Sequence, residues 1–253
     1  MKKQLLPLFL LFIGALASCS APSRSGEKAA QQLVDYFIYQ EKTATFSQTF
    51  REPKVLAEHL QTSRQQFQKQ FFNSLKEMNA EVTETEAQKL SAELLAQVKK
   101  KASYQLVATK ELNGQATITF QIKGLDFVTA IEDTTTALLQ QTQQATQALD
   151  MQHTLAVLKK EIRQINVSHE PVELPLTVKQ VEGQWYLPAV EQLRLNQFFL
   201  AFVTGKEDTD QLTEALDTSL TQAEQKVVTA DERTAISVSY THLRAHETVL
   251  DLV

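Results

Sequence analysis

The sequence is poor in the residues that most catalytic and metal-binding motifs require. Its 253 residues include six glycines, five histidines and one cysteine. It contains no glycine-rich phosphate loop, no G-x-S-x-G nucleophile motif and no H-E-x-x-H metal motif. The single cysteine, Cys19, excludes an internal disulfide and thiol-pair redox chemistry. We therefore expect a protein that is not an enzyme, with no catalytic residues, no metal site and no cofactor.

The chain also lacks a surplus of positive charge. Lysine and arginine number 25 and aspartate and glutamate 30, which gives a formal net charge of −5 at pH 7. A protein of this charge has no overall electrostatic attraction for the phosphate backbone of nucleic acid. We therefore expect no nucleic-acid partner.

The N-terminus has the layout of an export signal. Lys2 and Lys3 precede an apolar run from Leu5 to Leu16. This run has the length of a signal-peptide core and is too short to span a bilayer as a helix. The cysteine follows small residues in the order Leu16-Ala17-Ser18-Cys19. The pattern resembles a bacterial lipobox, in which the cysteine thiol receives a diacylglyceryl group and the signal is cut just before it.

This resemblance implies a signal peptide over residues 1–18 and a lipid-bearing Cys19 at the start of the mature chain. Residues 19–26 are then a lipidated tether, because the stretch from Ser20 to Gly26 is small and polar. The protein is expected on the extracytoplasmic face of the cell membrane, where two acyl chains suffice for stable anchoring. The alternative is a conventional secretory signal cut after Ser18, which would leave a free cysteine.

The last residues resemble translated sequencing adapter. Val238 to Thr248 read V-S-Y-T-H-L-R-A-H-E-T, which is similar to the translation of a transposon-type adapter over eleven consecutive residues. We therefore expect residues 238–253 to be an artefact and the natural reading frame to be interrupted near Ser237. His242 and His246 lie four apart, a spacing that can bind a metal on a helix. We assign them no site because they fall in this stretch.

The body of the protein begins with helical patterning. Apolar residues recur at helical spacing in three stretches, residues 30–37, 54–78 and 83–101. Pro53 lies at the first turn of the second stretch, where proline is tolerated. Thr83, with Glu86 three residues on, forms a capping-box pattern at the start of the third. The sequence therefore predicts three N-terminal helices.

The period of the apolar residues then changes from 3.6 to 2. Apolar and polar residues alternate in three stretches, residues 104–108, 116–122 and 172–178. Asn113-Gly114 separates the first two and is the strongest short signal for a β-hairpin. Glu182-Gly183 follows the third and turns the chain into residues 184–187. We predict a small curved antiparallel sheet from two hairpins.

The remaining apolar stripes predict a long central helix and closing helices. The long helix extends from about Phe127 to Asn166, with a kink or break near Asp150 where two stripes are offset. A helix that ends at Gly205 follows the second hairpin, and one more begins near Leu212. The fold class is therefore α+β. We expect an extracytoplasmic domain over residues 27–205 and a truncated C-terminal helical segment over residues 206–237.

Two segments carry a family resemblance. They are the strand Gln115–Gly124 with the following Leu125-Asp126-Phe127, and the run from Lys179 to Tyr186. The second has the order strand, turn, glycine, polar residue, tryptophan. Both are similar to uncharacterised lipoproteins of Gram-positive bacteria with a cystatin-like or nuclear-transport-factor-like domain. That family has no agreed activity, so the resemblance implies location and shape but no chemistry.

Trp185 and Tyr186 are the candidate ligand-contacting residues. Adjacent strand residues point to opposite faces, so one of the two is expected in the core and the other toward a cleft or solvent. A core position for Trp185 is the favoured interpretation. Either residue on the outward side would be available to a ligand.

Other polar residues form no recognisable constellation. The histidines outside the C-terminal stretch have no carboxylate or nucleophile at useful spacing. Asp208 and Asp210 resemble the start of a calcium loop that lacks its later ligands and its glycine. An enclosed pocket that joined two or more of six polar residues would indicate an enzyme; these are Glu132, Asp133, His153, His169, Asp208 and Asp210.

Three classes of function remain open. The leading hypothesis is a non-catalytic, membrane-tethered module that binds a ligand, a peptide or a neighbouring envelope protein. An enzyme with its site in the concave face of the sheet is the first alternative. A structural or adhesive surface lipoprotein is the second. An exposed apolar patch would favour protein partnership, and a deep pocket with converging polar groups would favour the enzyme.

Overall fold

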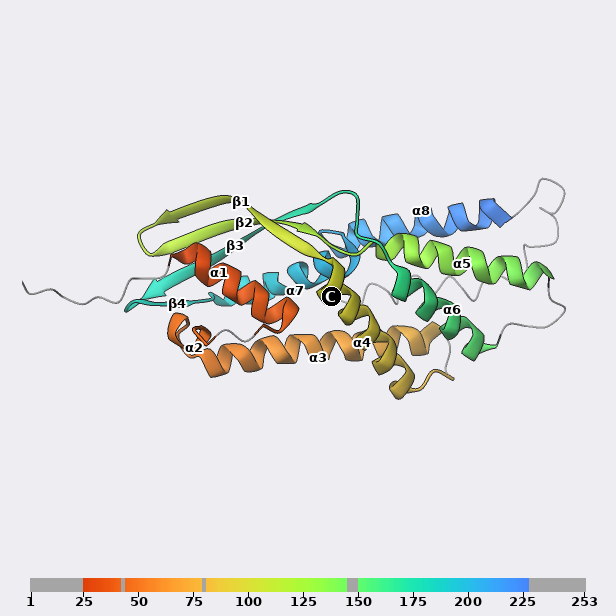
Figure 1. Ribbon diagram of the computed structural model, residues 1–253, viewed down its shortest axis with the longest axis horizontal. Coiled ribbons are helices and arrows are strands. Elements are labelled where there is room, and N and C mark those ends of the chain that lie inside the picture. The colour runs from red at the N-terminus through yellow and green to blue at the C-terminus, as the bar shows by residue number, and fades with distance from the viewer. Residues whose placement is uncertain (1–24, 42–43, 79–80, 145–149, 228–253) are drawn as a thin grey trace, which may run out of the picture.

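A four-stranded antiparallel sheet, helices packed on one of its faces and a helical lobe at one end make up the fold (Figure 1). The computed structural model describes residues 25–41, 44–78, 81–144 and 150–227. The predicted signal peptide, lipobox and Cys19, and the adapter-like residues, lie outside the described residues. The α+β class predicted from the sequence is confirmed.

The helices and strands follow the predicted order, with a π-helix and the short helix α2 in addition to the three predicted N-terminal helices. Before the sheet come α1 (Gly26–Val34), a π-helix (Asp35–Tyr39), α2 (Phe46–Thr49), α3 (Pro53–Met78) and α4 (Glu84–Lys101). The first hairpin is β1 (Ser103–Leu112) and β2 (Gln115–Lys123), and the second is β3 (Val172–Val181) and β4 (Gln184–Tyr186). Between the hairpins lie α5 (Phe127–Gln144) and α6 (Met151–Gln164); after them come α7 (Ala189–Thr204) and α8 (Thr209–Val227).

Local sequence signals set several of these boundaries. Pro53 is the first residue of α3, and the Thr83 hydroxyl and Glu86 carboxylate form the capping box at the start of α4. The first helix begins earlier than its apolar stripe indicates. Gly26, which the sequence placed in the tether, is the first residue of α1 and is buried.

Both hairpins turn through left-handed residues. Asn113 and Gly114 have φ of 52° and 73°, and Glu182 and Gly183 have φ of 52° and 82°. Two consecutive positive φ values match the twist of an antiparallel pair and are costly for residues other than glycine, asparagine and aspartate. The predicted hairpin at Asn113-Gly114 is therefore confirmed, and both of its turn residues have positive φ.

The alternation along the strands separates a buried face from an exposed one. Most of the inner face of β2 and β3 is apolar and almost inaccessible to solvent; its buried residues are Ala116, Ile118, Phe120, Ile122, Leu174, Leu176 and Val178. The helices α1 and α7 pack on this face, where the ring of Phe198 lies edge-on to Phe120 at 5.4 Å. Hydrophobic burial of the inner face therefore holds the sheet to both helices.

The predicted long central helix is wrong as a single element, although the break near Asp150 was expected. The chain instead forms α5 and α6, which lie side by side (Figure 1). Asp150 caps α6, because its carboxylate accepts a hydrogen bond of 2.7 Å from the backbone N–H of His153. Two offset apolar stripes cannot both face one core from a straight helix, and reversal of the chain lets both be buried.

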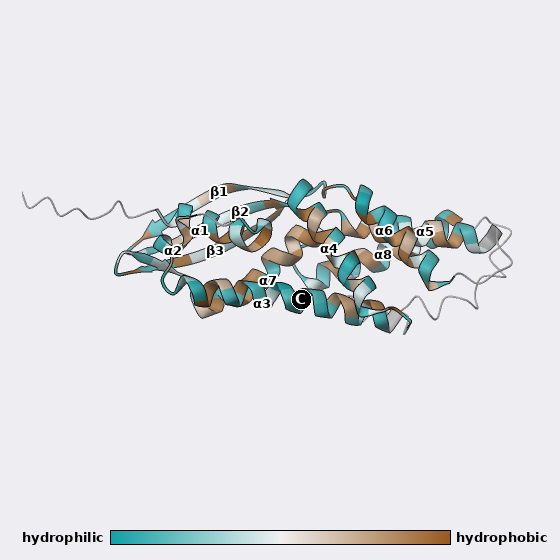
Figure 2. Cartoon of the chain, turned by 60° about the horizontal axis from the view of Figure 1, so that its bottom comes forward, coloured by the Kyte–Doolittle hydropathy of each residue, from teal (hydrophilic) through white to brown (hydrophobic). Residues whose placement is uncertain are grey.

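The C-terminal helix α8 packs along α5 and completes the helical lobe. A second small core joins Leu200, Leu212 and Leu216 to Val128 and Ile131. The lobe helices α5, α6 and α8 each carry both hydrophobic and hydrophilic residues (Figure 2). The buried residues of α8 recur at helical spacing. The predicted C-terminal helix is thus packed against the body.

The turn geometry predicts the effect of replacing Gly114. Valine at this position should lower the free energy of unfolding by about 1 kcal/mol or more, because a β-branched side chain is strained at positive φ. Chemical denaturation measures the effect. The control is Gln115→Val, one residue later in the exposed part of β2, where valine suits the strand. Equal stability of the two variants would contradict the strained-turn explanation.

Candidate functional site

Trp185 and Tyr186 lie on opposite faces of β4. Trp185 is 1% exposed and packs against Gly26 at the start of α1. Its backbone carbonyl accepts a hydrogen bond of 2.8 Å from the N–H of Arg51. Tyr186 is half-buried and pairs with Lys179 on β3. The expectation of one core residue and one outward-facing residue is confirmed, and a ligand-contacting role for either stays a prediction.

Tyr186 belongs to the outer face of the sheet, which is the largest open surface formed by the strands. In the described part of the chain, α1 and α7 contact the sheet from the inner side, and α2 borders it at β4. The outer face carries polar side chains from all four strands. They include Gln105 and Lys110 of β1, Thr117, Thr119 and Gln121 of β2, Glu173, Thr177 and Lys179 of β3, and Gln184 of β4.

Hydrogen bonds between side chains order this outer face. The hydroxyls of Thr117 and Thr177 lie 3.0 Å apart across β2 and β3. The amide of Gln121 donates to the Glu173 carboxylate at 2.9 Å and accepts from Gln105. A depression of about 360 Å³ lies near the first hairpin turn, lined by Lys110, Leu112, Asn113, Gln115 and Thr117. The face therefore presents fixed hydrogen-bonding groups beside an open hollow.

A second hollow lies in the helical lobe and is acidic. Its volume is about 160 Å³, and its lining includes Asp126, Asp133, Glu161, Gln164 and Asn166. Glu161 is buried and accepts hydrogen bonds from Gln164 and, at 3.0 Å, from Lys160. Burial and then the nearby Glu161 and Glu132 carboxylates raise the pKa of Asp133. Among the described residues, no group of three or more His, Cys, Asp or Glu side chains could hold a metal ion.

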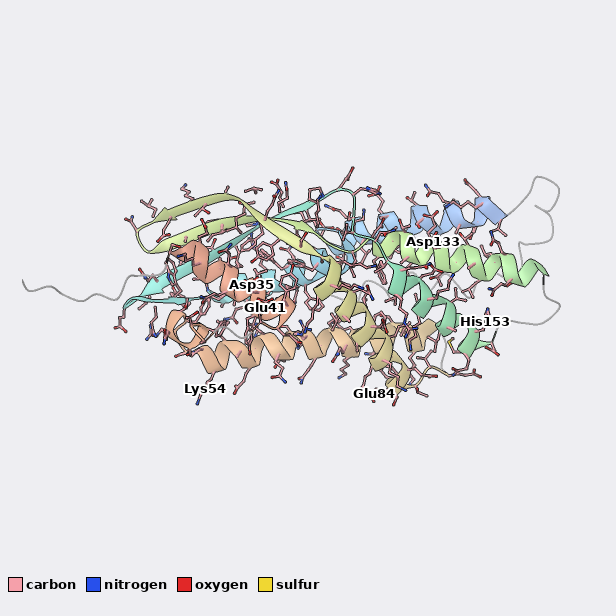
Figure 3. The ribbon with its side chains drawn as sticks, viewed as in Figure 1. Asp35, Glu41, Lys54, Glu84, Asp133 and His153 are labelled. Atoms are coloured by element: carbon pink, nitrogen blue, oxygen red, sulfur yellow. The ribbon has the colours of Figure 1, made fainter. Side chains whose placement is uncertain are left out.

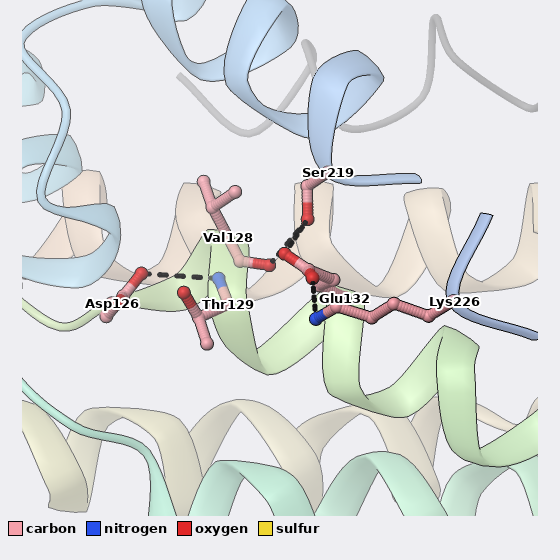
Figure 4. A network of polar contacts seen from close by, with 6 residues as sticks. All are labelled: Asp126, Val128, Thr129, Glu132, Ser219 and Lys226. Atoms are coloured by element: carbon pink, nitrogen blue, oxygen red, sulfur yellow. Dashed lines mark hydrogen bonds and ion pairs between the residues drawn. The ribbon is translucent and has the colours of Figure 1, made fainter. Parts of the chain in front are cut away.

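The structure brings only one of the six polar residues singled out in the sequence into this hollow. Asp133 lines it, whereas the adjacent Glu132 points to α8, where it accepts from Lys226 and, at 3.0 Å, from Ser219 (Figure 4). His153 is exposed near the outer end of the lobe (Figure 3). His169 is exposed as well, and Asp208 accepts from the N–H of Gln211 at the start of α8. Glu132 therefore serves a contact between helices, the two histidines lie on the surface and Asp208 caps α8.

An apolar cavity between the helices is nearly filled. About 10 Å³ of free space remains among its lining residues, which are Phe67, Phe71, Leu94, Phe127, Phe199, Leu200, Val203 and Thr204. This is barely room for one water molecule. The phenylalanine-rich closing helix therefore contributes packed core at this point and not the wall of a ligand pocket.

Sequence analysis missed the π-helix and the polar cluster around it. The hydroxyl of Tyr104 donates to the Asp35 carboxylate at 2.7 Å, and burial raises the pKa of Asp35. Arg64 donates to the carbonyls of Phe37 and Ile38 at 2.7 and 3.2 Å. π-Helices often mark functional sites, but here each of these polar groups has a partner within the fold. The apolar spacing of residues 30–37 does not distinguish a π-helix from an α-helix.

Comparison with known families gives one clear result. The family model described as a domain of unknown function, DUF5105, matches residues 16–203. The chain belongs to this family. The DUF5105 match begins at the first residue of the predicted lipobox and ends within α7. The helix α8 lies beyond it.

Other comparisons add little to the DUF5105 assignment. No curated protein matches the sequence. Among solved structures, the chain is similar to ycdA from Bacillus subtilis subsp. subtilis str. 168, which its name presents as a candidate lipoprotein. The TM-score is 0.48 at 14% identity, over 67% of this chain and 54% of the other. The chain thus spans about half the length of ycdA.

No helix within the described ranges is both long and apolar enough to cross a membrane. The cystatin-like or nuclear-transport-factor-like relationship stays a prediction. The adapter origin of residues 238–253 also stays a prediction.

The electrostatics of the acidic hollow predict a pH-dependent stability. A raised pKa means that ionised Asp133 is less stable in the folded protein than in the unfolded chain. Asp133→Asn should therefore raise the thermal unfolding midpoint slightly at pH 7, and the gain should disappear as the pH falls below 3.8, the ordinary pKa of the group. The exposed Glu170→Gln serves as control. A gain that persists at low pH would contradict this explanation.

Proposed function

We propose that this DUF5105 protein is a membrane-anchored extracytoplasmic lipoprotein whose body is a non-catalytic interaction module. Its binding surface is the outer face of the sheet, and its partner is an extended segment of a neighbouring envelope protein. The observation that carries the proposal is the placement of α1 and α7 on the same inner face. The opposite face keeps an ordered row of polar side chains open to solvent.

Two observations support the membrane anchor. The order of Lys2-Lys3, apolar run and Leu16-Ala17-Ser18-Cys19 is that of a lipobox signal. The family match begins at Leu16, so the cysteine and the residues before it lie within the family region. Two acyl chains on Cys19 would hold the protein stably at the membrane without a spanning helix.

The chemistry of the outer face favours a protein segment as ligand. Thr117, Thr119 and Thr177 present hydroxyls that both donate and accept, and Gln121 adds an amide. Three strand spacings of about 4.8 Å each give the face a width of roughly 14 Å, which fits one or two extended segments. Lys179 and Glu173 supply charges of both signs. A polypeptide backbone offers the matching donors and acceptors.

The enzyme alternative placed its site in the concave face of the sheet. In the structure, aromatic and aliphatic side chains of α1 and α7 occupy the inner face, as the contact of Phe198 with Phe120 shows. Substrate would have to displace this core. The non-catalytic proposal therefore uses the opposite face, where binding needs no rearrangement.

The anchor is tested by Cys19→Ala in cells. The variant should lose incorporation of labelled lipid and pass from the membrane fraction to the soluble or secreted fraction, because the thiol is the acceptor of the diacylglyceryl group. Ser20→Ala is the matched control, since it changes the neighbouring small residue and spares the thiol. Lipid label on the Cys19→Ala protein would refute the anchor.

The binding surface is tested by site-specific photocrosslinking in intact cells. A photoreactive amino acid at Thr119 on the outer face should give a discrete adduct with an envelope protein. The same group at the exposed Thr221 on α8 is the control and should not give that adduct. Thr177→Arg should abolish the Thr119 adduct, because its long side chain covers the neighbouring strand. An adduct of equal yield at both positions, or insensitivity to Thr177→Arg, would contradict the proposed surface.

A further inference from the structure

Exposed apolar side chains gather at one end of this elongated molecule. Six large hydrophobic residues are exposed among the described residues. Four of them are more than 60% exposed: Leu193 at 74%, Val190 at 64%, Leu112 at 63% and Val55 at 61%. Val181 and Val107 are less exposed. Such residues are normal when scattered singly, so their location decides whether they matter.

Backbone contacts place three of the six, Leu112, Val181 and Val55, at or beside the strand tips, and Val190 and Leu193 follow β4 closely along the chain. The carbonyl of Gly114 accepts from the N–H of Gln180 at 2.6 Å, which joins the tip of the first hairpin, with Leu112, to that of the second, with Val181. The N–H of Arg51 donates to Trp185, which places the start of α3, with Val55, beside β4. The helix α7 begins three residues after β4 and carries Val190 and Leu193 in its first turns. We call Leu112, Val181, Val55, Val190 and Leu193 the tip patch.

The lipid-bearing part of the chain enters the fold at this same end. The N–H of Gly26 donates to the Glu111 carboxylate at 3.2 Å, one residue from Leu112. Gly26 also lies against Ala116 and Trp185. Only residues 20–25 separate it from Cys19. The seven residue steps from Cys19 to Gly26 span at most about 25 Å, even when fully extended. A lipid on Cys19 would therefore keep Gly26, which lies beside the hairpin tip that carries Leu112, within this distance of the bilayer surface.

The opposite end of the molecule differs in character. Lys54 at the start of α3 marks the tip end, whereas Asp133 and His153 lie in the helical lobe at the other (Figure 3). Residues 206–227, which include α8, carry six acidic and two basic side chains. An acidic lobe is repelled by a membrane surface that bears anionic lipids. Exposed apolar residues and acidic charge thus lie at opposite ends of the long axis.

We infer that the tip patch is a membrane-contact surface. Leu112 of the first hairpin and Val190 and Leu193 of α7 enter the boundary between headgroups and acyl chains, and the helical lobe extends away from the membrane. The inference rests on the proposed lipidation of Cys19 and adds an orientation to it. Transfer of apolar side chains from water into this boundary region lowers the free energy. Apolar faces at membrane surfaces typically insert to a depth of about 5–10 Å. The outer sheet face then stands next to the bilayer, where a membrane-bound partner can reach it.

The test uses the full-length lipidated protein in vesicles of phosphatidylcholine. Because the thiol of Cys19 is blocked by its lipid, a cysteine introduced at another site is the single reactive thiol. An environment-sensitive NBD label is attached in separate variants at Leu112→Cys, Leu193→Cys and, in the acidic lobe, Gln222→Cys. All three positions are exposed, so the substitutions remove no core packing. Circular dichroism verifies the fold of each variant.

On vesicle binding, the labels at positions 112 and 193 should shift to shorter wavelength and be quenched by a lipid-borne quencher, whereas the label at 222 should do neither. Flotation of the vesicles is read separately. Protein that floats but keeps the labels at 112 and 193 in water overturns the membrane-contact surface and leaves the anchor intact. Protein that carries no lipid and does not float refutes the anchor itself. Labels that are shielded in cell membranes but not in protein-free vesicles overturn the inference in favour of a protein partner.

Discussion

The close contact of Gly26 with Ala116 and Trp185 is the constraint on which the arrangement of this protein depends. A Cβ atom at position 26 would overlap the Cβ of Ala116 and lie 2.9 Å from the Trp185 ring. Only glycine lets the first turn of α1 lie this close to the sheet. The contact joins the start of the described chain to β2 and β4, and through the backbone of Trp185 to the start of α3. Four separate segments therefore meet at one point.

Two consequences follow from this point of entry. With α1 laid against the inner face and α7 beside it, the apolar side chains of β2 and β3 are buried on that side only. The polar alternates on the same strands remain open, which makes the outer face available for binding. The described chain begins beside the strand tips at Gly26, so the proposed anchor and the tip patch lie at the same end of the fold.

The helical lobe is a second packing unit, in which α5 contacts α6, α7 and α8. Its polar contacts are directed: Glu132 binds Lys226 and Ser219 of α8, whereas the next residue, Asp133, faces the acidic hollow. Adjacent residues on a helix point about 100° apart, so one turn serves both a helix contact and a surface hollow. Glu132 is satisfied by its partners, whereas burial and the neighbouring carboxylates raise the pKa of Asp133.

Local signals in the sequence determined much of the secondary structure. The Asn113-Gly114 turn, the capping box at Thr83 and the proline at the start of α3 act over a few residues, so their geometry follows from nearest-neighbour sterics and hydrogen bonds. The alternation of Ala116, Ile118, Phe120 and Ile122 likewise predicted a strand with one buried face.

Only the tertiary structure decided what covers each face and which distant residues meet. The reversal between α5 and α6 depends on the core available to two offset stripes. The residues of the π-helix accept hydrogen bonds from Tyr104 and Arg64, which lie far along the chain. The gathering of Leu112, Val181, Val55, Val190 and Leu193 at one end depends on contacts between separate segments. Sequence periodicity records which side of an element is apolar. It does not record which element packs on that side, because packing depends on shape and distance summed over the whole chain.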